Sequence, residues 1–309
     1  MKVLLTGGAG FIGSHIIDKL LQENYDIVVV DNLSSGSLEN LPQSEKIKFY
    51  QKDIFLNDLT ELFEIEKPEY CIHLAAQTSV IKSVNEPVYD AQMNIISTLN
   101  LLHLCKKYNI KRFIAASTAA VYGTPKHWPI EESHPTEPIS YYGLSKLTME
   151  KYIQLSNIPY TIFRFANVYG PRQASSQESG VVAIFNDKML NNEPINIFGD
   201  GNQIRDFVYV EDIAQACVSS LKNNNTINQV LNYSTSIGVT INELFNLMKD
   251  IYNCSQDVNY LPARAGDIKD SILSNKKAAQ TISTTTFTPI KEGIKKLRDY
   301  YEKERIVNA

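Results

Sequence analysis

A tyrosine and a lysine four residues apart, Tyr142 and Lys146, have the types and the spacing that most directly suggest catalysis. On a helix the two side chains share one face. A free tyrosine loses its proton near pH 10, and an adjacent ammonium favours the phenolate. Moving that pKa to about 7 needs roughly 4 kcal/mol, about what one close positive charge supplies at an effective dielectric constant near 20. Tyr142 is therefore predicted to act as a general base, with Lys146 lowering its pKa.

A second pair with the same spacing, Tyr122 and Lys126, is expected by chance in a chain with 17 tyrosines. Its segment contains Gly123 and Pro125, which interrupt helices, so these two side chains need not face each other. The segment after Tyr142 instead continues as a helical pattern.

The hydroxyl of Thr118 supports a catalytic role for Tyr142 and Lys146. Thr118 ends the apolar run 113–116 after Ser117, at the edge of a predicted sheet where a nicotinamide ring would lie. A hydroxyl beside a phenolate can pass a proton or hold a substrate oxygen. Thr118 is predicted to be a proton relay.

Glycines near the start of the chain follow the spacing Gly7-x-x-Gly10-x-x-Gly13, between an apolar run and a helical pattern. Strand, glycine turn and helix together form the usual site for a dinucleotide pyrophosphate at a helix N-terminus. A phosphate loop of the Gly-x4-Gly-Lys-Ser/Thr type is the alternative, but Ser14 stands where that loop needs its lysine.

A carboxylate about 20 residues further on, Asp31, closes the apolar run 27–30. A carboxylate at this place accepts hydrogen bonds from the adenosine ribose hydroxyls. It also repels a 2′-phosphate, so the sequence favours NAD over NADP.

Strand and helix patterns alternate through the first half of the chain, which predicts an α/β fold of the Rossmann type, with a doubly wound parallel sheet. Beyond Gly170 the elements become shorter and less regular. We predict a dinucleotide-binding domain over 1–170, to which part of 205–230 returns, and a smaller substrate-binding α/β lobe over 171–309. A long helix is expected around Asn94 and Cys105.

The composition excludes several classes of partner. Charged residues make up 21% of the 309 residues and the net charge is −4, without a basic block, so nucleic acid and an anionic membrane surface are not expected to bind. No apolar run approaches the length of a membrane span. The four cysteines lie far apart, and the chain enters its first strand without a leader pattern. A cytoplasmic protein with reduced thiols is expected.

Cys71 and His73 share one face of a predicted strand and could suggest a metal site. No further ligands accompany them, so the sequence predicts two buried neutral side chains and no metal.

Taken together, the glycine turn, Asp31, Ser117-Thr118 and Tyr142-x-x-x-Lys146 resemble the extended short-chain dehydrogenase/reductase family. The segments 167–172 (NVYGPR) and 205–210 (RDFVYV) resemble its nucleotide-sugar branch of NAD-dependent epimerases and dehydratases, and within it the UDP-glucose 4-epimerases. The similarity runs from residue 2 to about residue 279.

The resemblance implies roles at the matching positions. With the residue patterns above, the predicted cofactor-binding residues are Gly7, Gly10, Phe11, Ile12, Gly13, Asp31, Asn32, Asp53, Ile54, Leu74, Ala75, Ala76, Gln77, Asn94, Tyr142 and Lys146. The residues implied to bind a UDP-sugar are Thr118, Tyr142, Asn167, Arg205, Arg264 and Ser271. Two guanidiniums can pair with a diphosphate, although Arg205 and Arg264 could equally form surface ion pairs.

The sequence also distinguishes reactions within the branch. Relatives that eliminate water or decarboxylate carry an acidic residue just after the hydroxyl segment, where this chain has Ala119 and Ala120. Alanine cannot transfer a proton, which favours a UDP-hexose 4-epimerase with a 4-keto intermediate over a dehydratase or decarboxylase. The alternatives that stay open at this point are another nucleotide-sugar enzyme of the branch, namely a uronic acid 4-epimerase, a dehydratase or a decarboxylase, and a non-catalytic NAD-binding regulator.

Ser271 bears on the choice of sugar. In relatives a bulky residue at this position restricts the pocket to plain hexoses, and a small one leaves room for an N-acetyl group. Ser271 therefore favours UDP-N-acetylhexosamines in addition to UDP-glucose and UDP-galactose. The resemblance further implies a homodimer formed through two helices of the first domain.

Overall fold

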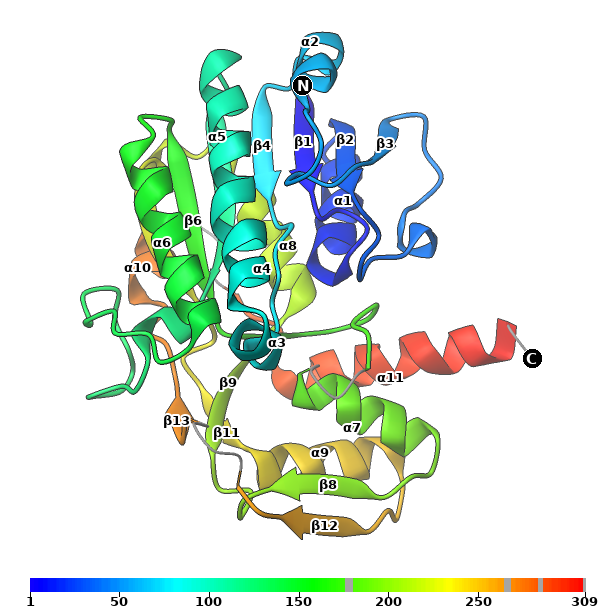
Figure 1. The fold of residues 1–309 in the computed structure, drawn as a ribbon. Coiled ribbons are helices and arrows are strands. Elements are labelled where there is room, and N and C mark those ends of the chain that lie inside the picture. Colours follow the sequence, from blue (N-terminus) through cyan, green and yellow to red (C-terminus); the bar gives the residue numbers. More distant parts are fainter. Residues whose placement is uncertain (176–179, 264–267, 283–285, 308–309) are drawn as a thin grey trace.

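A seven-stranded parallel sheet forms the upper part of the protein (Figure 1). The computed structural model describes residues 1–175, 180–263, 268–282 and 286–307. The strands lie in the order β10 (Gln229–Tyr233), β6 (Tyr160–Phe165), β5 (Arg112–Thr118), β4 (Tyr70–His73), β1 (Lys2–Thr6), β2 (Asp26–Asp31) and β3 (Ile47–Gln51). The order reverses at β1, so the predicted doubly wound α/β fold is confirmed.

The register brings the carboxyl ends of the central strands to one edge. Thr6 pairs with Val30 on one side and His73 on the other, and Thr118 pairs with Phe165. In open α/β sheets ligands bind outside this edge, where the strand order reverses.

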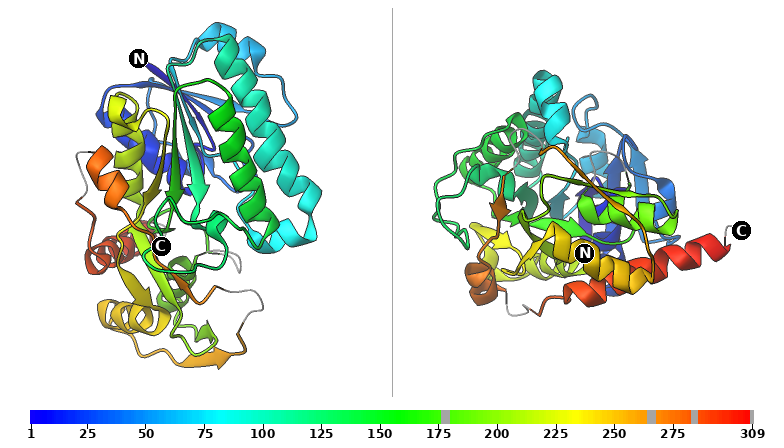
Figure 2. Two further views of the ribbon diagram at one scale, coloured as in Figure 1. Left: turned by 90° about the vertical axis from the view of Figure 1, so that its left-hand side faces the viewer. Right: turned by 90° about the horizontal axis from the view of Figure 1, so that it is seen from below.

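Helices cover both faces of the sheet (Figure 2). Apolar side chains of α1 (Phe11–Gln22), α8 (Val210–Ser220) and α10 (Lys276–Thr281) form the core on one face. Those of α2 (Thr60–Glu66), α5 (Ser97–Lys107) and α6 (Tyr141–Leu155) form the core on the other face. Burial on both faces explains the continuous apolar runs of the strands.

The long helix expected around Asn94 is divided. It consists of α4 (Pro87–Ala91), a π-helical turn η2 (Gln92–Ile96) and α5, and it is preceded by the short helix α3 (Val80–Asn85). A π-helical turn inserts a residue into the hydrogen-bond ladder and is frequent at functional sites. Three short 3₁₀ helices complete the upper part: η1 (Leu38–Asn40), η3 (Ala119–Tyr122) and η4 (Asn224–Thr226).

Below the sheet lies a second group of elements, the small lobe (Figure 1). Its first sheet contains β7 (Asn167–Tyr169), β9 (Ile204–Tyr209), β11 (Gly238–Thr240) and β13 (Asp270–Ser271). Its second sheet pairs β8 (Ile195–Phe198) with β12 (Val258–Leu261), and its helices are α7 (Val181–Leu190), α9 (Ile241–Tyr252) and α11 (Ile290–Val307). The sequence did not predict the strands β7, β11, β12 and β13, because strands this short carry too few residues for a periodic pattern. It did not predict the helix α7 either.

The small lobe has its own apolar core. Phe185, Phe207, Leu244 and Leu297 are among its buried side chains. The chain leaves the large sheet after β6, builds β7 to β9 and returns through α8 and β10, which pairs with β6. The two parts are therefore connected by several crossings of the chain.

Candidate active site

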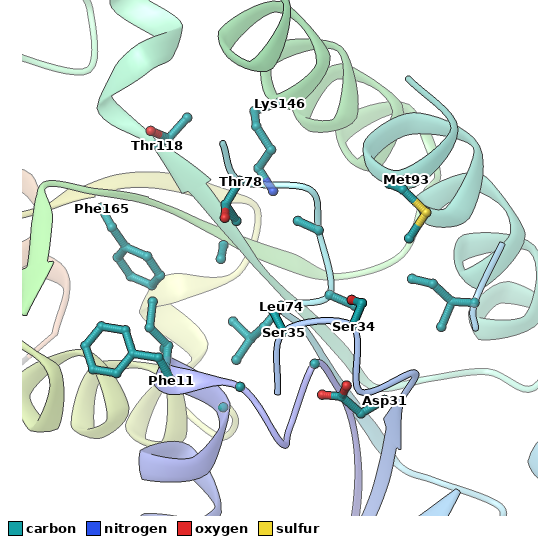
Figure 3. A pocket seen from close by; sticks show the side chains of 18 of the residues that line it. Phe11, Asp31, Ser34, Ser35, Leu74, Thr78, Met93, Thr118, Lys146 and Phe165 are labelled. Carbon is teal, nitrogen blue, oxygen red and sulfur yellow. The ribbon is translucent and has the colours of Figure 1, made fainter. Parts of the chain in front are cut away.

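A cavity of about 370 Å³ opens at the carboxyl edge of the large sheet (Figure 3). Fourteen of the predicted site residues line it: Gly7, Gly10, Phe11, Ile12, Gly13, Asp31, Asn32, Ile54, Leu74, Ala75, Ala76, Thr118, Tyr142 and Lys146. Asp31 lies at one end of this cavity, and Thr118 and Lys146 lie at the other end. The predicted dinucleotide turn and the predicted catalytic residues thus share one cavity.

The glycine turn has the shape that the spacing predicts. Gly7 has φ +73°, a conformation that favours glycine, and a Cβ atom there would lie 2.7 Å from the backbone nitrogen of Ala75. A Cβ atom on Gly13 would lie 2.2 Å from the carbonyl oxygen of Gly7, so only glycine lets α1 pack this closely on the turn.

The N-terminus of α1 points into the cavity. Gly10 is its N-cap residue, no side chain caps the helix, and its first turn carries no acidic residue. The free backbone N–H groups of such a turn and the helix dipole together attract an anion. This geometry fits the pyrophosphate of NAD.

Asp31 is positioned by two backbone N–H groups. Ala9 donates to Oδ2 at 2.9 Å and Leu33 donates to Oδ1 at 2.8 Å. Both carboxylate oxygens retain lone pairs that can accept from ribose hydroxyls, whereas a 2′-phosphate would meet a negative charge. Asn32 beside it donates from Nδ2 to Oδ2 of Asp53 at 2.8 Å, so Asp53 supports the wall without lining the cavity.

Gln77 and Asn94 also lie behind the cavity wall. The Gln77 N–H donates to Oδ1 of Asn94 at 2.9 Å, and Nδ2 of Asn94 donates to the Gln77 carbonyl at 3.0 Å. Nδ2 of Asn94 also lies 3.0 Å from the hydroxyl of Ser145 on α6. Asn94 faces inward and ties the turn after β4 to the helix that carries Tyr142.

Tyr142 and Thr118 line the same cavity, and the Thr118 side chain acts to lower the pKa of Tyr142. The Thr118 hydroxyl also accepts from the Ala120 N–H at 3.2 Å, which leaves its proton free to point at Tyr142. Burial nevertheless raises the pKa of Tyr142 to about 12, because desolvation outweighs the effect of Thr118, and the nearby charge of Asp90 also raises it. The sequence predicted that Lys146 lowers the pKa of Tyr142 to about 7. The side chains of the folded protein do not produce this shift.

Lys146 is buried, only 4% exposed, and its side chain points into the cavity (Figure 3). Desolvation lowers the pKa of Lys146 to about 8, against the opposing effects of Glu150 and Asp90. Its Nζ lies 3.4 Å from the sulfur of Met149. A buried cation with this pKa is still charged near neutral pH.

Beneath these residues lies a buried ion pair that the sequence did not predict. Arg164 on β6 donates from Nε and Nη2 to the two carboxylate oxygens of Glu150, at 2.9 and 2.7 Å. The Ser117 hydroxyl donates to Oε1 of Glu150 at 2.5 Å, which fixes the residue before Thr118. The available signal was that Glu150 lies one helical turn after Lys146, and that Arg164 interrupts an apolar strand.

The second tyrosine–lysine pair is not assembled. The Tyr122 hydroxyl donates to Oδ1 of Asn232 at 2.7 Å and accepts from Arg164, inside the core. Lys126 is exposed and pairs with Glu137. The helix-breaking residues between Tyr122 and Lys126 thus separate the two side chains, as predicted.

His73 and Cys71 are buried. Nδ1 of His73 lies 2.7 Å from the Thr6 hydroxyl and Nε2 lies 3.0 Å from the Thr98 hydroxyl. Desolvation lowers the pKa of His73 to about 3, so the ring is neutral as predicted. Both ring nitrogens are occupied by hydroxyl partners, which leaves no nitrogen for a metal ion.

Of the predicted substrate residues, Thr118 and Tyr142 line this cavity, whereas Asn167, Arg205 and Ser271 lie on the small lobe and do not line it. Arg205 on β9 pairs in register with Ser271 on β13, and its Nη1 donates to the carbonyls of Ile204 and Lys269 at 2.9 and 3.0 Å. Asn167 on β7, which also pairs with β9, donates to the Asp206 carbonyl at 3.1 Å. Arg264 lies outside the described residues. Strand β9 therefore brings Arg205 and Ser271 together from positions 66 residues apart in the numbering.

Among the described residues, no helix combines the length and the apolar character needed to cross a membrane.

The sequence matches the NAD dependent epimerase/dehydratase family over residues 3–234. It is 44% identical over 300 residues to a putative UDP-glucose 4-epimerase of Methanocaldococcus jannaschii, a match that covers 96% of each chain. The solved UDP-glucose 4-epimerase of Thermotoga maritima with UDP-glucose superimposes with a TM-score of 0.94 at 42% identity, covering 99% of this chain and 100% of that one. A UDP-N-acetylglucosamine 4-epimerase of Methanobrevibacter ruminantium, in complex with UDP-N-acetylmuramic acid, gives a TM-score of 0.93 at 36% identity over 98% of both chains.

Proposed function

The chain belongs to the NAD-dependent epimerase/dehydratase family, and from that premise we propose that it is an isomerase that inverts C4 of UDP-hexoses. The observation that carries the proposal is that Thr118, Tyr142 and Lys146 line the same cavity as the uncapped N-terminus of α1 and Asp31. This arrangement supports a site where a sugar hydroxyl and a dinucleotide meet. The relatives that act on UDP-glucose and UDP-N-acetylglucosamine match nearly the whole chain.

The proton chemistry follows from three side chains. Tyr142 removes the proton of the C4 hydroxyl and returns it after the sugar has turned over. The Thr118 hydroxyl donates to the phenolate and relays the proton, because its hydrogen bond stabilises the charged form of Tyr142. Lys146 contributes a buried positive charge in the same cavity and a donor for the nicotinamide ribose.

Bound NAD supplies a reversible hydride acceptor and a positively charged ring, so that a transient 4-keto sugar can form and be reduced from either face. The glycine turn would hold its pyrophosphate and Asp31 its adenosine ribose. Since an epimerase must keep the cofactor through both half-reactions, the close packing at Gly7 and Gly13 suits a resident cofactor. Ala119 and Ala120 offer no acid for the elimination or decarboxylation chemistry of other family members.

The substrate would be anchored by its UDP moiety on the small lobe, through Asn167, Arg205 and Arg264. Two guanidiniums can bind a diphosphate by charge-assisted hydrogen bonds, and such an anchor lets the sugar turn while the nucleotide stays bound. Ser271 is small and lies in register with Arg205, which supports acceptance of an N-acetyl group. We therefore include UDP-GlcNAc and UDP-GalNAc among the substrates.

We further propose a homodimer. Exposed apolar side chains gather on the adjoining elements α3, α4, η2 and α6: Val80, Ile81, Val84, Val88, Ile96, Leu144 and Leu155. Exposed apolar side chains on adjoining elements are typical of a protein–protein interface. Sedimentation analysis should give a dimer that Val84→Asp converts to monomer, and a monomeric wild type would contradict it.

The free thiols of the four cysteines fit a cytoplasmic setting.

The decisive experiment incubates the protein, separately, with UDP-glucose, UDP-galactose, UDP-GlcNAc, UDP-GalNAc and UDP-glucuronic acid and separates the products. We expect each pair to interconvert without release of reduced cofactor. No interconversion of any pair would instead favour a non-catalytic NAD-binding regulator. Conversion of UDP-glucuronic acid alone would favour a uronic acid 4-epimerase.

A further inference from the structure

Asp90, on α4, is a buried carboxylate for which the mechanism above has no use. It is 1% exposed, and its Oδ1 accepts from Nε2 of Gln77 at 2.8 Å and from Nδ2 of Asn94 at 3.1 Å. In the part of the chain that the structure describes, no lysine or arginine forms an ion pair with it. Two amide donors satisfy its hydrogen bonds but do not neutralise its charge.

Asp90 lies in the second layer of the active site. Tyr89 and Met93, on either side of it, line the same cavity as Lys146, and so do Ala76 and Thr78, the neighbours of Gln77. Met93 faces Lys146 across the cavity in Figure 3. Helices α4 and α6 pack against each other, so the carboxylate is held close to the helix that carries Tyr142 and Lys146.

The titratable groups nearest Lys146 on the surrounding elements include His73 on β4, Tyr142 and Glu150 on α6, and Tyr89 and Asp90 on α4. His73 on β4 is neutral, and Tyr142 on α6 is neutral while it carries its proton. Glu150 on α6 is already paired with Arg164 through two hydrogen bonds, so its charge is offset locally. The charges of Glu150 and Asp90 both raise the pKa of Lys146, and Glu150 does so more strongly. Asp90 differs from Glu150 in having no arginine or lysine in an ion pair with it among the described residues, so its charge is free to balance the Lys146 ammonium in a desolvated site.

A chain of hydrogen bonds also connects Asp90 to Tyr142. Nδ2 of Asn94, which donates to Asp90, lies 3.0 Å from the Ser145 hydroxyl, and that hydroxyl donates to the Tyr142 carbonyl at 3.0 Å. The π-helical turn η2 places Asn94 where it can reach Gln77, Asp90 and α6 together.

We propose that Asp90 is the counter-ion of Lys146 and a positioning residue for epimerisation, which holds the ammonium charged and orients the Gln77–Asn94 amides against α6. The chemical role rests on the proposed function, but the charge pairing does not.

The charge of Asp90 shifts the pKa values of Lys146 and Tyr142 in the same direction. The negative charge of Asp90 raises the pKa of Lys146 and also raises the pKa of Tyr142. It thus keeps the cation charged and opposes premature loss of the tyrosine proton. An epimerase uses the same tyrosine as base in one half-reaction and as acid in the other, so a phenolate that is too stable would slow the return of the proton.

A double-mutant cycle tests the pairing without any measurement of activity. Asp90→Asn keeps Oδ1 for both amide donors and removes only the charge. Lys146→Met leaves Asp90 buried without a counter-ion and should lower the unfolding midpoint in urea, and adding Asp90→Asn should restore most of that loss. Losses that simply add in the double variant would overturn the proposal. If Asp90→Asn alone does not fold, the double variant should still fold, and its failure would count equally against the pairing.

The pH dependence tests the effect on the reaction. In Asp90→Asn the basic limb of the epimerisation profile should move about one pH unit lower, as expected for loss of a neighbouring opposite charge. Tyrosinate absorbance, compared between Asp90→Asn and Asp90→Asn/Tyr142→Phe, should show Tyr142 titrating at lower pH than in the wild type. Ser145→Ala breaks the hydrogen-bond chain without changing charge. It should lower the epimerisation rate but leave the pH of the basic limb unchanged. An unchanged limb and an unchanged tyrosinate titration in Asp90→Asn would contradict the proposal, whereas an inactive wild type would contradict only the proposed function.

Discussion

The two sides of the candidate site are built differently. The cofactor side lies at the ends of long parallel strands, where Thr6, Asp31, His73 and Thr118 come to one edge in register. The substrate side rests on β7 and β13, strands of three and two residues that lie against β9.

The two sides therefore also differ in the kind of group available for binding. At the cofactor side the proposed binding groups are mostly backbone groups: the uncapped turn of α1 for the phosphates, and the N–H groups that position Asp31. At the substrate side the proposed binding groups are individual side chains on short strands. We infer that substitutions at the first side affect every substrate, and that those at the second affect the choice of sugar.

The largest effect is expected where the two sides meet. Tyr142→Phe removes the group that takes the proton and should lower epimerase turnover about a hundred- to ten-thousand-fold, while NAD stays bound. Turnover by product separation and NAD content by absorbance measure the two effects separately. The neighbouring Tyr141→Phe is the matched control, since Tyr141 is exposed and outside the cavity. Near-normal turnover in Tyr142→Phe would refute its role as base.

A backbone change should damage the cofactor side as a whole. Gly13→Ala would place a Cβ atom 2.2 Å from the Gly7 carbonyl oxygen, so the turn must move. We expect a loss of about 1–3 kcal/mol in the free energy of unfolding and at least a tenfold loss in NAD affinity, measured by urea unfolding and calorimetry.

Gly10→Ala is the comparison for that change, because its Cβ atom would lie 3.3 Å from the same oxygen. It should unfold almost like the wild type and still bind NAD less well, since Gly10 adjoins the phosphate position. Equal stability of Gly13→Ala and the wild type would show that the close packing is not required.

The same difference explains what could be predicted from the sequence. Gly7, Gly13 and Asp31 form a local motif whose geometry follows from spacing within one strand–turn–helix unit, and the structure reproduces it. The positions of Asp53, Gln77 and Asn94 behind the wall could not be derived from spacing, because they depend on side-chain contacts between separate loops.

The pKa of Tyr142 shows another limit. A four-residue spacing identifies the neighbouring lysine, but it does not show how strongly the site is desolvated, and desolvation dominates here. The Glu150–Arg164 pair and the contact of β13 with β9 likewise join segments that are distant in sequence. Periodicity within one element carries no information on such pairings.

On the substrate side, a substitution of Ser271 should alter the selectivity between sugars rather than overall catalysis. Ser271→Tyr adds bulk in register with Arg205 and should lower turnover of UDP-GlcNAc about ten- to a hundredfold more than that of UDP-glucose. Parallel assays of both substrates give this ratio. Ser271→Ala adds no bulk and should leave the ratio unchanged. Equal losses for both substrates in Ser271→Tyr would exclude a steric role for this position.

The smallest effect concerns how the substrate side responds to pH. Asp206 on β9 is buried and accepts from the Thr235 N–H and hydroxyl at Oδ1 and from the Ser236 N–H at Oδ2. Burial raises the pKa of Asp206 from 3.8 to about 6, because desolvation outweighs these hydrogen bonds. The folded state therefore holds the proton more tightly than the unfolded state, so the contribution of Asp206 to stability is largest below about pH 4 and is lost as the pH rises to about 6.

Asp206→Asn should remove the contribution of Asp206 to the pH dependence of the free energy of unfolding. Its Nδ2 cannot accept from the Ser236 N–H, so the variant should be less stable than the wild type at pH 4, by about 1–3 kcal/mol. The difference in the free energy of unfolding between wild type and variant, from urea titrations between pH 4 and pH 7, isolates Asp206 from other groups that titrate there. This difference should shrink as the pH rises, because the wild type loses stability over that range and the variant does not. A constant difference would mean that Asp206 is ionised throughout, and that the hydrogen bonds at β9 compensate fully for its burial.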